Sequence, residues 1–189
     1  IISNKKNEEI ISAIEESECK IVFHLVADGL TLGDLRNISI SRANGEFLIQ
    51  WDDDDLYHKD RILTMINVLR ESNADLAFLS KWQLYWISKK KLALSSSRIW
   101  EGSVIMKRYA SIIYPSLSKG EDTAVVTNQI KKHKIALVNA PHLYTYCITG
   151  LNTHDENHFE SLFNVSKLYS SLDADNIKRK LDYFRYLNL

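Results

Sequence analysis

Short apolar runs alternate with amphipathic segments along most of the chain. The runs "KIVFHLV" (20–26) and "EFLIQW" (46–51) are rich in Ile, Val, Phe and Trp and are bounded by Gly and Asp. Runs of this kind predict buried strands. In "DRILTMINVLRES" (60–72) apolar residues recur every three to four positions, which predicts a helix that begins near Asp60. This order of elements indicates an α/β fold with a mostly parallel sheet flanked by helices.

The remaining elements follow the same logic. Apolar runs predict further strands over 74–79, 82–87, 135–139 and 143–149, with an antiparallel portion from about 80 to 108. A helix is predicted over 121–133, and a helical tail from about 158 to the last residue. We expect one domain over residues 1–155 and a helical tail over 156–189 packed on it, because neither a repeat nor a Pro/Gly-rich linker divides the chain.

Charge and composition exclude several classes of function. The 189 residues are 45% hydrophobic, and 24 basic residues balance 24 acidic ones, so no overall field favours nucleic acid or an anionic membrane. Cys19 and Cys147 are too far apart in sequence to suggest a metal site or a disulfide framework. No apolar stretch reaches the ~18 residues that span a bilayer. The expected location is the cytoplasm, including the inner face of its membrane.

The chain begins with Ile1 rather than Met and shows no signal-peptide pattern. We therefore expect it to be a piece of a longer protein. A membrane anchor or a second domain is then expected to lie outside the printed sequence.

Four consecutive aspartates, Asp52 to Asp55, follow directly on the predicted strand 46–51. In α/β sheets, ligands bind beyond the carboxyl ends of the strands, which is where this acidic run falls. Two carboxylates ~4 Å apart repel by about 1 kcal/mol in water, and a divalent cation removes that cost. Carboxylate oxygens suit Mg²⁺, Mn²⁺ or Ca²⁺ rather than Zn²⁺. A solvated acidic turn that caps the next helix is the alternative.

The surrounding sequence resembles a known family. The stretch "LGDLRNISISRANGEF" (32–47) leads into the strand and its Asp-x-Asp motif in the order and spacing typical of glycosyltransferase family 2. "WEGSVIMKR" (100–108) with "GEDTAVV" (120–126) is similar to that family's acceptor loop and Glu-Asp pair. "LYTYCITGLNT" (143–153) resembles more weakly the segment that closes the donor site.

This resemblance implies a Rossmann-like, A-type glycosyltransferase fold and an enzyme that transfers a sugar, with inversion, from a nucleotide diphosphate donor to a saccharide or glycolipid acceptor. Surface polysaccharide, lipopolysaccharide or glycoconjugate synthesis is the expected context. A divalent metal, Mn²⁺ or Mg²⁺, is the implied cofactor, with Asp54 as a ligand and Asp52 near the metal or the ribose. Asp122 would act as the general base, with Glu121 orienting the acceptor or the helix start.

Other residues receive binding roles. The donor would contact Arg36, whose guanidinium suits a diphosphate, together with Asn37 and Asp53. The acceptor would contact the segment that contains Trp100, Glu101 and Gly102. Each of these residues also has a purely structural explanation. Arg36 can form a surface ion pair, Trp100 can pack against its neighbours, and the Glu-Asp pair can compensate a helix dipole.

Three departures from the family pattern limit these assignments. Thr149 occupies the position where many members have a metal-binding His, so His154 is the candidate substitute. Residues 1–16 fit best as the end of the second strand and the following helix, which leaves out the first strand-helix unit. In the alternative alignment Ile1 to Ser3 is the first strand and Asp28 binds the base. The family's Gln-x-x-Arg-Trp motif is absent after the Glu-Asp pair, which argues against a processive synthase.

Two other functions stay open. A non-catalytic nucleotide-sugar or carbohydrate-binding module would explain Thr149 and the short amino-terminal part. A sugar-phosphate nucleotidyltransferase would share the sheet and the metal, but it needs a glycine-rich phosphate loop that the six glycines of this chain do not form.

Overall fold

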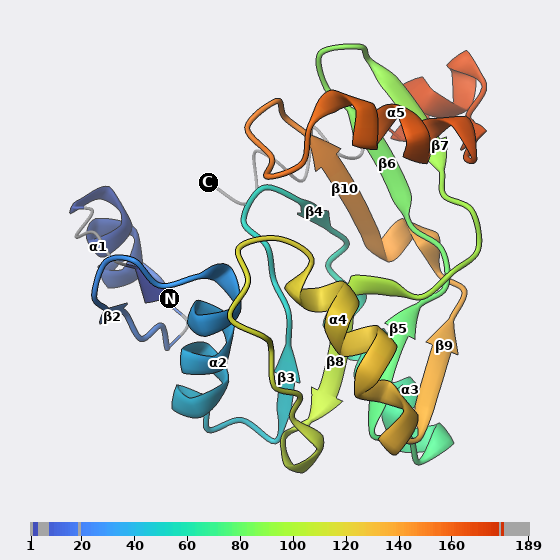
Figure 1. Cartoon of the computed structure of the whole chain (residues 1–189). Helices are drawn as coiled ribbons and strands as arrows, with labels where there is room; N and C mark the ends of the chain where they lie inside the picture. The colour runs from blue at the N-terminus through green and yellow to red at the C-terminus, as the bar shows by residue number, and fades with distance from the viewer. Residues whose placement is uncertain (1, 4–7, 19, 178, 180–189) are drawn as a thin grey trace.

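The computed structural model describes residues 2–3, 8–18, 20–177 and 179. Their strands form three sheets, shown in Figure 1. The four-stranded sheet has the order β3 (Phe47–Ile49), β8 (Trp100–Lys107), β5 (Leu76–Leu79), β9 (Ile135–Val138). The five-stranded sheet has the order β11 (Lys167–Leu168), β7 (Lys91–Leu94), β6 (Gln83–Trp86), β10 (Tyr144–Ile148), β4 (Leu56–Tyr57). The third sheet contains β1 (Ile2–Ser3) and β2 (His24–Leu25).

Five α-helices flank these sheets: α1 (Glu8–Glu15), α2 (Leu32–Arg42), α3 (Arg61–Ser72), α4 (Glu121–Asn128) and α5 (Glu156–Asn164). Short 3-10 turns cover Arg108–Ala110, Ile130–Lys132 and Pro141–Leu143, and residues 171–177 are also helical. None of the described helices combines the length and the apolar character needed to cross a membrane.

The four-stranded sheet is buried on both faces. Leu76 and Phe78 of β5 pack in a cluster with Val125 of α4, whereas Leu79 belongs to a cluster with Met65 of α3. Figure 1 shows α3 and α4 on opposite sides of this sheet. Since alternate residues of a strand point to opposite faces, a strand covered on both sides reads as a continuous apolar run. This is why β5 and β8 lack an alternating pattern.

The α/β class with flanking helices is confirmed, but the sheets are mixed rather than mostly parallel. Parallel pairing joins β1 to β2, β6 to β10 and β5 to β9. The pairs β3–β8, β5–β8, β6–β7, β4–β10 and β7–β11 are antiparallel. In particular, β8 lies antiparallel between β3 and β5. The composition of an apolar run does not show the direction in which its strand lies in the sheet. That direction depends on the connections between the strands.

Several predicted boundaries are also corrected. The run 20–26 contributes only the two-residue strand β2, and the helix predicted over 121–133 ends at Asn128 before a 3-10 turn. The tail is not wholly helical, because β11 pairs antiparallel with β7 and so joins the five-stranded sheet. The last part of the predicted helical tail, residue 178 and residues 180 to 189, lies outside the described residues.

The amino-terminal segment forms a strand-helix-strand unit of its own. Within the described residues β1 pairs with β2 and not with β3. A cavity of about 710 Å³ lies between this unit and the main sheet, with Ile2 of β1, Ile40 of α2 and Leu48 of β3 among its lining residues. The main-sheet side of that cavity ends at Asp52 and Asp53.

Helix α2 is fixed against the chain that leads to α4. Thr31 and Asp34 form a capping box at the amino-terminal end of α2, in which the Thr31 side chain accepts from the Asp34 N–H. At the second residue of the helix, a Cβ on Gly33 would lie 1.9 Å from the carbonyl oxygen of Pro115. Only glycine permits this close approach. It brings Arg36, on the same helix, beside the start of α4.

Candidate active site

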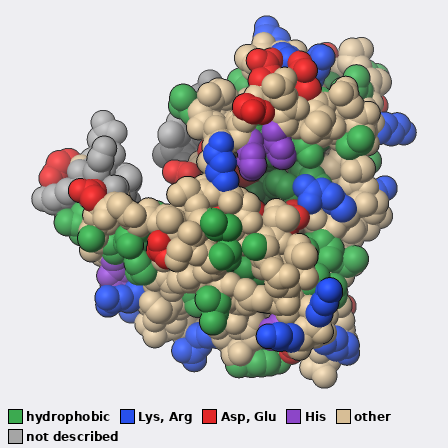
Figure 2. All heavy atoms as spheres, viewed as in Figure 1, with side chains coloured by type: hydrophobic (Ala, Val, Ile, Leu, Met, Phe, Trp, Pro, Cys, Tyr) green, Lys and Arg blue, Asp and Glu red, His purple; other side chains and the backbone are tan. Residues whose placement is uncertain are grey.

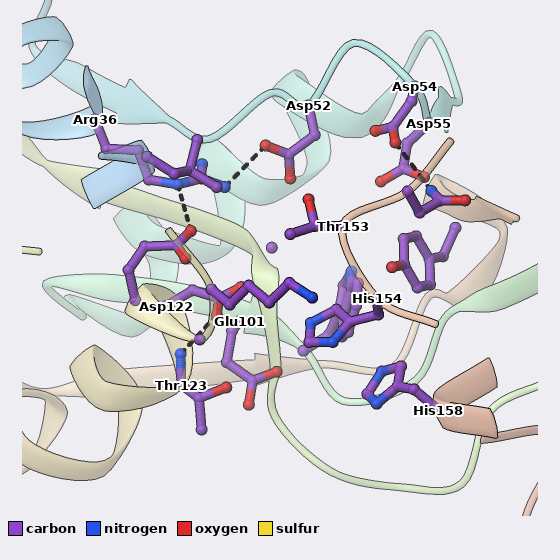
Figure 3. Close-up of a pocket in the computed structure, with 18 of the residues that line it drawn as sticks. Arg36, Asp52, Asp54, Asp55, Glu101, Asp122, Thr123, Thr153, His154 and His158 are labelled. Atoms are coloured by element: carbon purple, nitrogen blue, oxygen red, sulfur yellow. Dashed lines mark hydrogen bonds and ion pairs between the residues drawn. The ribbon is translucent and has the colours of Figure 1, made fainter. Parts of the chain in front are cut away.

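Three segments that are far apart in sequence enclose a cavity of about 290 Å³. They are the acidic turn between β3 and β4, the residues from 118 to 123 at the start of α4, and a wall built from β8, β10 and the turn before α5. Figure 3 shows the acidic turn on one side of the cavity, Asp122 on another and the two histidines of the third segment opposite Asp122. Residues predicted to bind the donor, the acceptor and the metal therefore face the same cavity.

Asp52 is hydrogen-bonded through both its carboxylate and its backbone. Arg36 Nη2 donates to Asp52 Oδ1 over 3.1 Å and Gln50 Nε2 donates to Oδ2 over 3.0 Å. The hydroxyl of Tyr57 accepts from the backbone N–H of Asp52 at 2.8 Å and lies 2.9 Å from its carbonyl oxygen. These contacts fix the first position of the Asp-x-Asp motif and use one acceptor position on each oxygen of its carboxylate.

Asp54 and Asp55 have contrasting environments. Asp54 is exposed, with one oxygen accepting from Asn152 Nδ2 over 3.0 Å. Asp55 is buried and accepts from the Cys147 N–H over 2.8 Å and from the Tyr144 hydroxyl. Burial raises the pKa of Asp55 well above its usual range, and desolvation with added repulsion from Asp52 raises the pKa of Asp54.

A buried arginine lies beneath this turn. Arg61 of α3 is 0% exposed, and its Nη2 donates to the carbonyl oxygen of Gln50 over 3.0 Å. Its guanidinium carbon lies 4.4 Å from the ring centre of Tyr57 and 4.9 Å from that of Tyr144. Burial lowers the pKa of Arg61. Cation–π contacts with these rings stabilise a charge that has no carboxylate partner among the described residues.

The Glu-Asp pair at the start of α4 divides into a buried and an open carboxylate. Glu121 is 2% exposed and accepts from Arg36 Nε over 2.9 Å. Burial by itself would lower the pKa of Arg36, but the negative charges of Asp52 and Glu121 raise this pKa. Asp122 lines the cavity, and its carboxylate accepts from the N–H of the adjacent Thr123 over 2.7 Å. Gly120, at φ +68°, makes the left-handed turn that starts the helix.

Aromatic rings form the wall opposite the donor residues. Trp100 stacks on Trp82 with ring centres 4.3 Å apart, and Arg98 Nη1 donates to both oxygens of Glu101 over 2.9 Å. Burial raises the pKa of Glu101. A Cβ on Gly102 would lie 3.2 Å from the Tyr144 hydroxyl. Trp100, Glu101 and Gly102 all line the cavity, so the predicted acceptor segment is at its edge.

The turn before α5 closes the cavity. Asn152 donates from Nδ2 to Asp54 and, over 3.0 Å, to the carbonyl oxygen of Cys147, while its Oδ1 accepts from the N–H of Thr149 over 2.8 Å. Thr149 thus supports the turn and does not line the cavity, whereas His154 and His158 do. The two imidazoles stack with centres 4.1 Å apart. Burial, with repulsion from His154, lowers the pKa of His158.

Two predicted donor residues lie elsewhere. Asn37 accepts from the Tyr114 N–H over 2.9 Å and donates to the Tyr114 carbonyl over 2.8 Å, so both of its amide atoms are used to hold the 114 segment. Asp28 lies on an exposed turn and lines neither the 290 Å³ cavity nor the 710 Å³ cavity. Asp53 is exposed and lines both the 290 Å³ and the 710 Å³ cavities. Asn37 therefore holds the segment around Tyr114 in place, and its side chain does not line the 290 Å³ cavity.

The acidic turn is the part of the cavity whose chemistry suits a divalent metal ion. Within the described part of the chain, no three His, Cys, Asp or Glu side chains are grouped so as to hold an ion. Asn152 bonds to one oxygen of Asp54, which leaves the other oxygen for a ligand, and Asp52 lies two residues before it in the turn. Mg²⁺ is often held by one or two carboxylates plus substrate phosphates, and the acidic turn fits that mode. It does not fit a cage made by the protein alone.

Sequence reasoning missed several members of the site. Gln50, Arg98 and Tyr144 reach it through contacts across the sheets, and no local motif marks them. His158 follows His154 by four residues, a spacing that puts two side chains on one helical face. This spacing is the one feature of the sequence that indicates a place for His158 beside His154.

The fold is similar to that of solved structures of S. aureus TarS. The crystal structure of S. aureus TarS 1-349 aligns with a TM-score of 0.58 at 16% identity, over 77% of this chain and 50% of that one. TarS 1-349 in complex with UDP-GlcNAc aligns with a TM-score of 0.60 at 14% identity, over 93% and 60%. The complex with UDP gives 0.60 at 14%, over 85% and 57%. This chain spans about half to three fifths of those structures, and the likeness confirms an A-type glycosyltransferase fold.

The family follows from the sequence. A model of "Glycosyl transferase family 2" matches residues 3–110, more than half of the 189-residue chain. The chain belongs to glycosyl transferase family 2. No curated protein matches it significantly.

Proposed function

We propose that this chain carries the catalytic site of a metal-dependent, inverting, non-processive glycosyltransferase. It would move a sugar from a nucleotide diphosphate donor to a hydroxyl of a saccharide or glycolipid in the cytoplasm. The observation that carries the proposal is the open carboxylate of Asp122, which faces the same cavity as the acidic turn. Arg36 joins the two by bonding to Asp52 and Glu121.

The donor would lie along Arg36 and the acidic turn. A guanidinium forms paired hydrogen bonds with phosphate oxygens, and Arg36 lines both cavities, so a diphosphate at this point can extend into either. TarS structures hold UDP and UDP-GlcNAc, which supports a uridine diphosphate sugar as the first donor to test. Asp52 and Asp53 would contact the nucleotide portion.

The metal would be Mg²⁺ or Mn²⁺, bound by Asp54 with Asp52 beside it. Such an ion, when bound, stabilises negative charge on the departing nucleotide diphosphate. The role of the acidic turn is to hold its carboxylates in place before the ion arrives, through the bonds of Asp52 to Arg36 and Gln50 and that of Asp54 to Asn152.

Asp122 would act on the acceptor. Its carboxylate takes the proton of the acceptor hydroxyl while the hydroxyl oxygen forms a bond to the anomeric carbon. The bond from that carbon to the phosphate oxygen breaks on the opposite face, which inverts the configuration and releases the nucleotide diphosphate. Glu121 is already paired with Arg36, so it would position Arg36 rather than take a proton.

Calorimetric titration with UDP-GlcNAc, with and without MnCl₂, tests the donor step. We expect binding only with the metal, and slow metal-dependent hydrolysis of the donor in a parallel assay. If neither UDP nor any of the UDP-, GDP- and dTDP-sugars binds, the proposed function is wrong. A non-catalytic binding module is the second candidate, favoured by the lack of a three-residue metal group in the described chain. It predicts donor binding without hydrolysis or transfer.

A further inference from the structure

Acidic and basic side chains both line the cavity. The acidic turn supplies four carboxylates beside Arg36, and Glu101, Glu121 and Asp122 add three more. Figure 2 shows histidine side chains in a hollow, with Lys and Arg on either side of them and Asp and Glu above them. Beside Arg36, the basic and imidazole groups of the lining that can donate hydrogen bonds to an anion are Arg98, Lys119, His154 and His158.

Three of these groups have donors that the protein does not use. Arg98 is paired with Glu101, but no ion pair or side-chain hydrogen bond joins Lys119 or either imidazole to another described residue. His154 and His158 contact each other through stacked rings, with centres 4.1 Å apart, and this leaves their ring nitrogens at the ring edges. Unused donors that line a cavity are suited to bind a ligand that accepts hydrogen bonds.

A cation is a poor match for this end of the cavity. Two imidazoles would offer two ligands, but the described chain provides no third His, Cys, Asp or Glu grouped with them. Lys119 lines the same space, and its charge repels a metal ion, whereas the charge of Arg98 is compensated by Glu101. An anion is attracted by Lys119 and can accept from the imidazoles.

We propose that Lys119, His154 and His158 form an anion subsite, so that the acceptor is a saccharide or polyol bearing a phosphate or carboxylate near its reacting hydroxyl. This rests on the proposed function, since it places the acceptor between Asp122 and the histidine pair, which lie on opposite sides of the cavity in Figure 3. The hydroxyl meets Asp122 and the anionic group reaches the mouth. A neutral acceptor leaves these donors unused and binds more weakly.

Titration with small polyols tests the subsite directly. The protein is saturated with UDP and Mg²⁺, so that the diphosphate position is filled, and is titrated with glycerol 3-phosphate, glycerate and glycerol. We expect at least one of the two anions to bind about tenfold or more tightly than glycerol, because a charge-assisted hydrogen bond is about twice as strong as a neutral one. The ratio of the two anions distinguishes phosphate from carboxylate.

Matched variants locate the binding. Lys119→Met removes the ammonium, and His158→Phe keeps a planar ring beside His154 while removing the ring nitrogens; each should weaken the preferred anion about fivefold or more. Lys131→Met makes the same charge change at an exposed position that does not line the cavity, and should have no effect. UDP affinity should be unchanged in all three.

The outcomes separate this inference from the proposed function. Equal binding of glycerol and both anions, or parent-like anion binding by both cavity variants, overturns the subsite even where UDP binds normally. If UDP does not bind, the donor proposal fails, and the same anion titrations without UDP still test Lys119 and His158. Displacement of the anion by stoichiometric Zn²⁺ would identify the histidine pair as a metal site and overturn the proposal.

Discussion

The acidic turn and the start of α4 pair their carboxylates in the same way. In each, one carboxylate is buried and bonded while a neighbour faces the cavity: Asp55 bonds to Tyr144 and Cys147 beside the exposed Asp54, and Glu121 bonds to Arg36 beside Asp122. Buried carboxylates anchor a segment and are unavailable to a ligand. The open neighbour is then the residue that can do chemistry.

The two regions differ in how their negative charge is compensated. At α4 a cation within hydrogen-bond distance neutralises the buried carboxylate, since Arg36 Nε lies 2.9 Å from Glu121. In the acidic turn the buried carboxylate has only neutral donors, and repulsion among the aspartates adds to the raised pKa of Asp54. This difference supports our proposal that the acidic turn receives a cation, whereas the buried carboxylate of α4 already has a cationic partner in Arg36. The following variants test this contrast, from the largest expected effect to the smallest.

Asp122→Asn tests the open carboxylate at α4. The amide keeps the size of the side chain but cannot take a proton, so turnover should fall by the ~100- to 10,000-fold that general-base catalysis supplies. Donor affinity should hardly change, because in the proposed mechanism Arg36 and the acidic turn carry the donor contacts. Transfer rate and calorimetric donor affinity are measured on the same variant. A variant that transfers within about threefold of the parent would exclude Asp122 as the base.

Asp54→Asn tests the open carboxylate of the acidic turn. Removal of an anionic ligand should weaken Mn²⁺-dependent donor binding by about tenfold or more, because a divalent ion depends on carboxylate charge. The melting temperature without metal should hold or rise, since repulsion with Asp52 is relieved. Calorimetry and thermal denaturation in EDTA measure the two effects. Donor binding as tight as that of the parent would remove Asp54 from the metal site.

Glu121→Gln tests the buried pair at α4. It leaves Arg36 with Asp52 as its single carboxylate partner, so unfolding free energy should fall by about 1–3 kcal/mol. Urea denaturation measures it. The control is Glu156→Gln, which removes an exposed carboxylate bonded to Lys89 over 2.6 Å and should cost less than about 1 kcal/mol. Equal costs for the two variants would show that Glu121 is not a buried anchor.

Asp55→Asn tests the buried carboxylate of the turn through its pH dependence. A folded-state pKa above the unfolded value of 3.8 contributes stability that is complete at low pH and lost as the pH rises through the folded pKa. The melting temperature of the variant relative to the parent should therefore be higher at pH 8 than at pH 5. Asp53→Asn, an exposed change of the same charge, should show a smaller trend in EDTA. A difference that falls with rising pH would contradict a raised pKa.

Much of the site was predictable because its signals are local. An apolar run that ends in the acidic turn, and a Glu-Asp pair at a helix start, are properties of neighbouring residues, and the resemblance to family 2 depends on such segments. The helix over 60–72 was predicted nearly to the residue, since its periodicity is uninterrupted. Asn37 was predicted as a donor ligand but bonds to the Tyr114 backbone, because a side chain's partner across the fold leaves no local trace.

By itself, then, the sequence determined the α/β class, the family, and the identity of the residues that carry charge into the site. Only the tertiary structure decided which carboxylates are buried. Arg36 meets Glu121 across 85 positions and Asp54 meets Asn152 across 98, while β8 runs antiparallel between β3 and β5. The physical reason is that hydrophobic period and motif spacing are set within a few residues, whereas strand direction and side-chain pairing depend on how distant segments pack.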